Sequence, residues 1–439
     1  MSRRFFLLPL AALPLLGVAA TFTVTVTDLD LGDIDPGDGE CAWATFPPSD
    51  QRCTLRAAII ESNALPGADT VIVPFGADIV LDRAGRNEDA GALGDLDITE
   101  ALIITTPALS SPDQSAVIDA DQIDRVLDVR HVSGDVRLHN LRIRGGAADD
   151  ATTFVGGGIR ALNGKLVLAY CDVQNNIANA GGGIYTSGSL EVAFSAIHAN
   201  ATLDLGFANP FGSAIKDSDG GPDPGDAILI HDSSIYANLA LFGTGTRAAV
   251  DVRTPITLWN STLAMNVPQA LHAYGTTASL NHVTISGSQI GYVFGGNSLA
   301  AQSALRNTII AGNSMQDCRF DGSYGYSHAW TLASDDSCNL AFGPDNLPGV
   351  DARLRPLAPR LGRWPVHDLA SGSPAIDSAD PQLAGAGGSC LGEDQDGVLR
   401  PLDGDGDGAR CDMGAIEFVD LIFADGFEPP PRRPARTAI

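Results

Sequence analysis

One acidic segment contains the residue types best suited to binding chemistry. It opens with Lys216 and contains four aspartates, Asp217, Asp219, Asp223 and Asp226. Carboxylates beside an ammonium group can bind a sugar or a cation, and a base beside a cation suits proton removal next to a carboxylate. We take these five residues as a candidate ligand-binding site and assign no catalytic residue. An acidic loop without a ligand is the open alternative.

A second acidic run indicates metal chemistry. Asp403, Asp405 and Asp407 alternate with glycines, which places oxygen ligands at positions 1, 3 and 5 of a loop with glycine at position 6. This is the first half of a calcium loop, and position 12 is Gly414 instead of glutamate. We expect Asp412 to complete the site, so Ca²⁺ is the predicted cofactor. A flexible acidic turn is the alternative.

The cysteines fall into three local pairs and one single residue. Local pairs in an exported chain predict disulfides, and the single Cys171 occupies a small inward position of a repeat, which predicts a buried thiol. Zinc is disfavoured because no CxxC spacing occurs. The expected disulfide cysteines are Cys41 with Cys53, Cys318 with Cys338, and Cys390 with Cys411.

The elements that must position these residues are repeats. Residues 165–202 contain the same pattern twice, with the second copy 24 residues after the first. The first position of this pattern recurs along the chain. A period of this size with β-rich content predicts stacked coils, each too small to bury its apolar face alone. The first positions are Val136, Leu166, Leu190, Ile228, Ile256, Ala278 and Ser303.

Three strands and two or more corners make up each coil. Near the fifth position of each coil, the inward-facing side chains change from one set of alternate residues to the other. Asparagines at this position, such as Asn260, tolerate left-handed backbone. A third strand follows each second corner, as in GGGIY at 181–185. Asparagines that recur at the eleventh position predict a hydrogen-bonded ladder along the axis. The ladder residues are Asn176, Asn200, Asn238, Asn266 and Asn313.

These features predict an all-β fold, a right-handed parallel β-helix solenoid, with an N-terminal helical cap and a small C-terminal β-rich domain. The run TLRAAIIESNAL predicts the capping helix, with Thr54 as its N-cap and Pro66 at its end. The coil that starts at Leu190 is the longest, and its excess residues flank the strand that ends at Lys216. Insertions over a rigid scaffold commonly carry function.

The residues also resemble known families. CTLRAAI at 53–59, after an Asp-rich loop, resembles the CSLREA-type N-terminal region of exported bacterial β-helix proteins, with Thr54 and Ala57 replacing the Ser and Glu of that motif. The coils resemble pectin-lyase-like and polymorphic-outer-membrane-type repeats. SGSPAIDSADP, DQDGVLRP and CDMGAIE, in that order, resemble the choice-of-anchor Q domain. The resemblance implies export and surface display.

The expected organisation has five parts. Residues 1–20 are a cleaved signal peptide, because Arg3 and Arg4 precede a short apolar run. Residues 21–66 form the cap and 67–343 the β-helix. Residues 344–417 form the choice-of-anchor-Q-like domain, and 418–439 form a tail. No later segment is long and apolar enough to span a membrane, so we expect a secreted, extracellular or cell-surface monomer.

Charge limits the partners. The formal net charge is -26, and removal of Arg3 and Arg4 takes it to -28 (-26 - 2). Such an excess of carboxylates repels polyanions, so nucleic acid is not an expected partner. The leading hypothesis is a non-catalytic β-helix protein that binds glycans or other surfaces in adhesion or a structural role. The alternative is a calcium-dependent polysaccharide lyase or another carbohydrate-active enzyme, such as a glycoside hydrolase, that uses loops 203–226.

Overall fold

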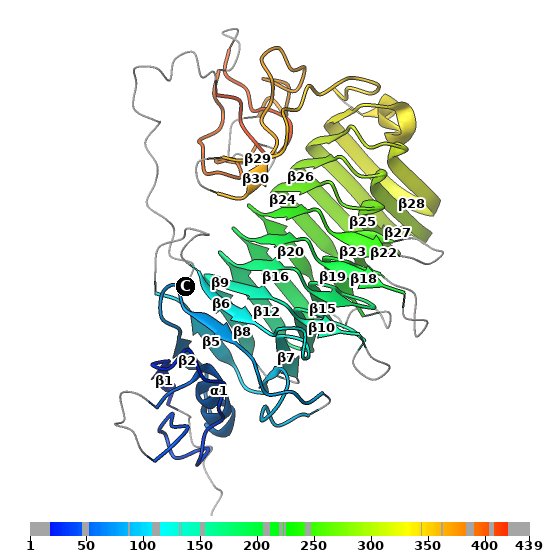
Figure 1. Cartoon of the computed structure of the whole chain (residues 1–439). Helices are drawn as coiled ribbons and strands as arrows, with labels where there is room; N and C mark the ends of the chain where they lie inside the picture. The colour runs from blue at the N-terminus through cyan, green and yellow to red at the C-terminus, as the bar shows by residue number, and fades with distance from the viewer. Residues whose placement is uncertain are drawn as a thin grey trace, which may run out of the picture.

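The computed structural model describes residues 18–45, 52–86, 88–107, 115–130, 132, 134–149, 154–204, 211–218, 223, 225–241, 247–343, 345–360, 363–382, 390–403 and 408–419. Most of the predicted signal peptide and tail lies outside these residues. The predicted solenoid is confirmed, because successive strands pair in parallel one coil apart along most of the chain (Figure 1). In the described part of the chain, no helix has the length and apolarity that crossing a membrane requires.

The first strands of successive coils form one continuous row. It runs through β1 (Thr21–Thr23), β2 (Asp69–Ile72), β5 (Leu102–Thr105), β8 (Asp135–His139), β12 (Lys165–Ala169), β16 (Ser189–Ala193), β20 (Ile228–His231), β24 (Ile256–Ala264), β26 (Thr277–Ser286), β27 (Ile290–Ala311) and β28 (Gln316–Ala333). Leu166 pairs with Val136 on one side and with Leu190 on the other. Ile228, Ile256, Ala278 and Ser303 continue this register, so the predicted first positions are confirmed.

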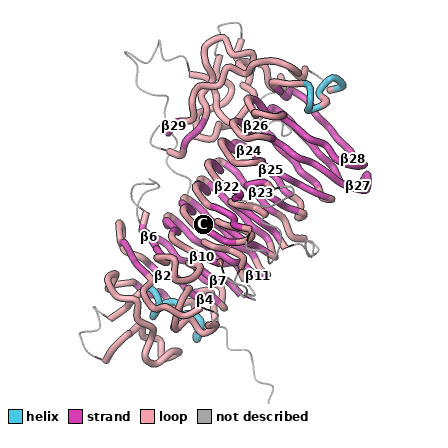
Figure 2. The backbone as a smooth tube through the Cα atoms, turned by 45° about the vertical axis from the view of Figure 1, so that its right-hand side comes forward, coloured by secondary structure: helices cyan, strands magenta, loops and turns pink. Residues whose placement is uncertain are grey.

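Two further rows complete the coils (Figure 2). The second contains β3 (Asp78–Val80), β6 (Ala116–Asp119), β9 (Leu141–Arg144), β13 (Asp172–Gln174), β17 (Ala196–His198) and β21 (Ser234–Tyr236), and then the later parts of β24, β26, β27 and β28. The third contains β4 (Leu96–Ile98), β7 (Leu127–Arg130), β11 (Ile159–Leu162), β15 (Ile184–Thr186), β19 (Ile215–Asp217), β23 (Ala248–Val252) and β25 (Gln269–Tyr274), and then the starts of β27 and β28. A short sheet of β10 (Ala147–Ala148), β14 (Ile177–Ala178), β18 (Ala201–Leu203) and β22 (Leu239–Leu241) lies at the second corner.

The asparagine ladder lies where the sequence predicts it. The Nδ2 atom of Asn176 donates to Oδ1 of Asn200, and Asn200 and Asn238 donate in the same way to the next asparagine, at 3.0–3.1 Å. Each amide also donates to a carbonyl of the preceding coil, such as Ile197 O for Asn238. Ser288 interrupts the row, and its backbone N–H donates to Asn313. The ladder therefore satisfies buried polar groups along one corner of the solenoid without any charge.

The left-handed first corner is confirmed, but its occupants are more varied than expected. Positive φ angles occur at Asn140, Asn260 and Asn307, and also at Tyr170 (56°) and Phe194 (48°). Aromatic residues seldom adopt this backbone conformation. The two rings stack with centroids 5.0 Å apart and an interplanar angle of 9°. Contact between neighbouring coils therefore stabilises a residue type that local propensity disfavours.

The N-terminal end is closed by α1 (Leu55–Ala64), and the side chain of Thr54 caps it by accepting from Ala57 N. The helix packs against β2 and β4, which confirms its predicted position over the first coil. Arg56 fixes this position, because its guanidinium is buried, pairs with Asp30 and donates to the carbonyls of Gly91, Gly94 and Asp95. All five of its donors are used.

All three predicted disulfides form, and Cys171 is free and buried, as expected. Burial raises the pKa of the Cys171 thiol to about 12, which leaves it un-ionised and unreactive near neutral pH. At the far end, the Cys318–Cys338 disulfide ties β28 to the 3₁₀ turns η3 (Asp336–Cys338) and η4 (Leu340–Phe342).

The C-terminal region, residues 345–419, lies along the second row of strands beside β24 and β26 (Figure 1). Among its described residues, the one regular strand pair is β29 (Ala358–Pro359) with β30 (Pro365–Val366), so regular β-structure is sparser than a β-rich domain implies. Its apolar core includes Ile309, Ala311 and Leu332 of the solenoid. The region therefore completes its core with side chains from the outer face of the β-helix.

Candidate functional site

The acidic segment singled out in the sequence divides into two groups. Lys216 and Asp217 lie on β19 and are buried, with exposed fractions of 2% and 1%. Asp223 and Asp226 lie in the following loop, where Asp226 accepts from Asp223 N and from Ser189 Oγ. Asp219 lies outside the described residues. The predicted five-residue site is therefore not shown as one cluster.

Lys216 and Asp217 organise the outer face of the third row. The Lys216 ammonium lies 3.1 Å from Asp217 Oδ1 and 3.5 Å from Asp251 Oδ1. On the next coil, His272 Nδ1 lies 2.8 Å from Asp251 Oδ2. Asp217 Oδ2 accepts from the backbone N–H groups of Arg253 and Thr254. These contacts make Lys216 and Asp217 positioning groups within the fold, since their charges are paired inside the protein.

Sequence reasoning missed Asp251 and His272. Both occupy the same outward position of the third strand as Lys216, as the strand registers show. An alignment of the third strands with one another, made independently of the first strands, could have found these two residues.

The predicted calcium ligands also separate. Asp405 and Asp407 lie outside the described residues, and Asp403 is exposed. Asp412 is buried, and its two carboxylate oxygens accept from the backbone N–H groups of Asp377 and Phe418. With these oxygens committed to the backbone, Asp412 fits an internal network better than a metal site. Among the described residues, no group of three or more His, Cys, Asp or Glu side chains is arranged to hold a metal ion.

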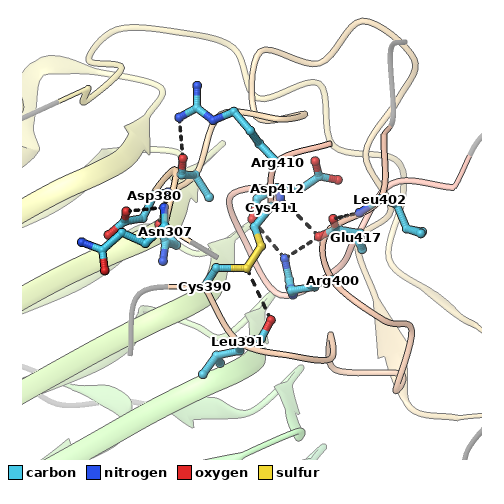
Figure 3. The surroundings of a disulfide bond; sticks show 12 residues. Asn307, Asp380, Cys390, Leu391, Arg400, Leu402, Arg410, Cys411, Asp412 and Glu417 are labelled. Carbon is cyan, nitrogen blue, oxygen red and sulfur yellow. Dashed lines mark hydrogen bonds and ion pairs between the residues drawn. A yellow bond between two sulfur atoms is a disulfide. The ribbon is translucent and has the colours of Figure 1, made fainter. Parts of the chain in front are cut away.

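That internal network surrounds the Cys390–Cys411 disulfide (Figure 3). The buried Arg400 guanidinium donates to Glu417 Oε2 at 2.7 Å and to the carbonyls of Asp412 and Gly414. Burial, together with the Glu417 charge, raises the pKa of Asp412 well above its usual value. The network therefore contains more carboxylates than Arg400 alone can neutralise.

A groove opens where the C-terminal region meets the solenoid. We call it the junction groove; it has a volume of about 320 Å³, at the small end of ligand-binding pockets. Its solenoid wall contains Phe194, Asp232, Trp259 and Asn260, and its C-terminal wall contains Leu391, Glu393, Gly397 and Leu399. Asn260 Nδ2 donates to Glu393 O at 2.8 Å and joins the two walls.

Two members of an aromatic row, Phe194 and Trp259, line the junction groove. Tyr170, Phe194, His231 and Trp259 follow one another along the solenoid axis, with ring centroids 5.0, 5.7 and 4.6 Å apart. Trp364 of the C-terminal region donates from Nε1 to Phe194 O, within this row. The Phe194 and Trp259 rings give the groove apolar surface for a ligand.

Two carboxylates form the polar side. Asp232 is held on both sides, by His231 Nδ1 at 2.8 Å and by Asn260 Nδ2 at 3.1 Å. The Glu393 backbone contacts Asn260, whereas its carboxylate has no hydrogen-bond or ion-pair partner in the described part of the chain. The groove thus combines aromatic rings with carboxylate oxygens that can still accept hydrogen bonds.

A second pocket, of about 530 Å³, lies at the N-terminal end of the asparagine ladder. Its Asp119 carboxylate already accepts from Arg144 Nε and from Asp121 N. No aromatic side chain is among its lining residues. The junction groove is therefore the better candidate for a ligand with both apolar and polar surfaces.

Comparison with known proteins adds little to this picture. No protein-family model matches the chain, and no curated protein sequence matches it. Among solved structures, the crystal structure of pectate lyase Pel9A is similar, with 10% sequence identity and a TM-score of 0.39, over 91% of this chain and 98% of that one. A score of this size does not establish a common fold, so the β-helix assignment rests on the strand registers.

Proposed function

We propose that this protein is an exported, non-catalytic β-helix protein that binds a carbohydrate in the junction groove. Sugars present apolar C–H faces and hydroxyl edges, and the groove offers aromatic rings beside carboxylate oxygens. The observation that carries the proposal is this pairing of Trp259 and Phe194 with Asp232 and Glu393 in one groove. The three disulfides suit an oxidising compartment, which supports export.

Binding is favoured over cleavage at the Lys216 segment. A lyase that used Lys216 would need that ammonium free to meet a substrate carboxylate or a proton. The ammonium is instead 2% exposed and lies beside Asp217 and Asp251. The surface display implied by the choice-of-anchor resemblance remains part of the proposal, and the C-terminal region would then serve both to display the protein and to form one wall of the groove.

Calorimetric titration with a panel of neutral and charged oligosaccharides tests the proposal. We expect Trp259→Ala to weaken binding of any ligand found by about tenfold, because loss of an aromatic wall removes of the order of 1 kcal/mol. Tyr326→Ala is the matched control, since Tyr326 is an exposed aromatic residue on the last coil, outside the groove. Equal affinities for the wild type and Trp259→Ala would contradict the proposal.

A further inference from the structure

The charge around the junction groove is unbalanced, and the imbalance indicates which carbohydrate it takes. Arg360 is paired, since it lies 3.2 Å from Asp394, a lining residue of the groove, and 3.2 Å from Asp368. Arg363 lies at the Gly397 end, where it faces Asp396 and Tyr170. His231 is committed to Asp232 and Glu191. None of these three side chains forms an ion pair with the Glu393 carboxylate.

The position of Glu393 suits a ligand cation. Glu393 and Trp259 both line the groove, and the Glu393 backbone carbonyl accepts from Asn260, the residue next to Trp259. One face of the indole stacks on His231, and no second ring is stacked on it among the described residues. A cation beside a tryptophan face and a carboxylate gains both a cation–π contact and a charge-assisted hydrogen bond.

We propose that the junction groove binds an amino sugar, with its protonated primary amine between the Glu393 carboxylate and the Trp259 ring. This inference rests on the proposed carbohydrate-binding function and names its ligand class. The protein's net charge of -26 acts in the same direction, because it attracts a cationic glycan and repels polyanionic ones.

Three hexasaccharides of the same linkage test the inference by calorimetry at about pH 6, where a primary amine is protonated. They are a β-1,4-linked glucosamine hexamer, its fully N-acetylated form and the glucose hexamer. We expect the wild type to bind the glucosamine hexamer about tenfold more tightly than the acetylated one, as a hydrogen bond between charged groups implies. Glu393→Gln should remove this preference, so that the glucosamine and acetylated hexamers bind with affinities within about twofold of each other.

Two controls separate a specific site from general attraction to an acidic protein. Glu40→Gln removes an exposed carboxylate in the N-terminal loop, far along the chain from the groove, and should leave the preference intact. Trp259→Ala keeps every charge but should weaken both the glucosamine and the acetylated hexamers. Circular dichroism should show the same β-sheet spectrum for all variants.

The outcomes are distinct. Equal affinity of the wild type for the glucosamine and acetylated hexamers, or a preference that survives Glu393→Gln, would overturn the amino-sugar inference. Trp259-dependent binding of the neutral hexamers would then still support the proposed function. Glucosamine binding that is insensitive to Trp259→Ala would show a general charge effect and overturn the inference as well. Binding of none of the three, nor of any other oligosaccharide in the panel, would overturn both.

Discussion

The asparagine ladder of the coils and the Arg400 network of the C-terminal region satisfy buried polar groups in opposite ways. In the coils, the buried polar line at the second corner is made of neutral amides, in which each asparagine bonds to the next coil. In the Arg400 network of the C-terminal region, the buried polar groups are ions, with Arg400 between Glu417 and the backbone around Asp412 (Figure 3). Both arrangements satisfy hydrogen bonds, but only the second depends on charge.

The two regions also differ in how they obtain a core. One apolar cluster runs through the coils from Phe22 to Leu340. The smaller cluster of the C-terminal region combines its own side chains, such as Ile376 and Met413, with Ile309 and Leu332 from the outside of the solenoid. The coils can therefore order themselves rung by rung, whereas the C-terminal region needs the finished solenoid surface. Four predictions follow from this difference, from the largest expected effect to the smallest.

Replacement of Arg400 by Met should be the most damaging change. It leaves the Glu417 and Asp412 carboxylates buried without their cation, which commonly costs about 3–5 kcal/mol of stability. Hydrogen exchange should show early loss of protection in residues 390–419 and unchanged protection in coils 166–266. Arg410→Met is the matched control, because Arg410 is exposed and donates to a single carbonyl, Ala379 O. Equal effects of the two substitutions would contradict the ionic account.

Raising the pH should weaken the C-terminal region. Burial, and then the Asp394 charge, raises the pKa of Asp396 to about 7, so the folded state holds a proton that the unfolded state releases near pH 4. The contribution of Asp396 to stability should therefore fall as the pH rises from about 4 to 7 and level off above that, by an amount on the order of 4 kcal/mol at most.

Asp396→Asn should reduce this decline in urea unfolding followed at residues 390–419, and the part that comes from Asp412, whose pKa burial also raises, should remain. The first coils provide an internal comparison, since burial also raises the pKa of Asp95 to about 8 and of Asp97 to about 7. Their pH response should persist in Asp396→Asn. The prediction is wrong if the C-terminal region is equally stable at about pH 4 and at about pH 7.

Calcium should stabilise the C-terminal region if Asp403, Asp405 and Asp407 bind it. Binding to the folded state alone raises stability by about 2.7 kcal/mol when free calcium is 100 times its dissociation constant. The C-terminal transition should then occur at a higher temperature in calcium than in chelator, and the coils should not respond. Asp405→Ala should abolish the difference. If the wild type and Asp405→Ala respond to calcium in the same way, the segment with these three aspartates is only an acidic turn.

Asn238→Leu should have the smallest effect of the four, because it breaks one rung of a neutral ladder. The substitution leaves the backbone N–H of Asn200 and the carbonyl of Ile197 without their partners, at a cost of about 1–3 kcal/mol. The loss should be the same at pH 5 and pH 8, as urea titration at about these two values can check, because amides do not titrate. Thr257→Leu, on the outer face of β24, is a control expected to have little effect.

The sequence by itself determined the parts of this protein that depend on local or repeated patterns. The coil register, the line of asparagines, the Thr54 cap and the three disulfides could all be predicted. Each depends on neighbours in the chain or on the same position one coil away, and stacking repeats one interaction many times. The same regularity made Cys171 predictable as a buried thiol, because its position in the repeat is an inward one.

Only the tertiary structure decided where the candidate site lies. Asn260 meets Glu393, and Phe194 meets Trp364, through contacts that span 133 and 170 residues of sequence. No period links the coils to the C-terminal region, so no pattern in the chain predicts which of its loops reaches which coil. Burial of Lys216, in contrast, had a signal in the repeat, because Asp251 occupies the same third-strand position one coil away. The spacing of residues within a repeat specifies each coil. A groove between two dissimilar regions exists only after both have packed together.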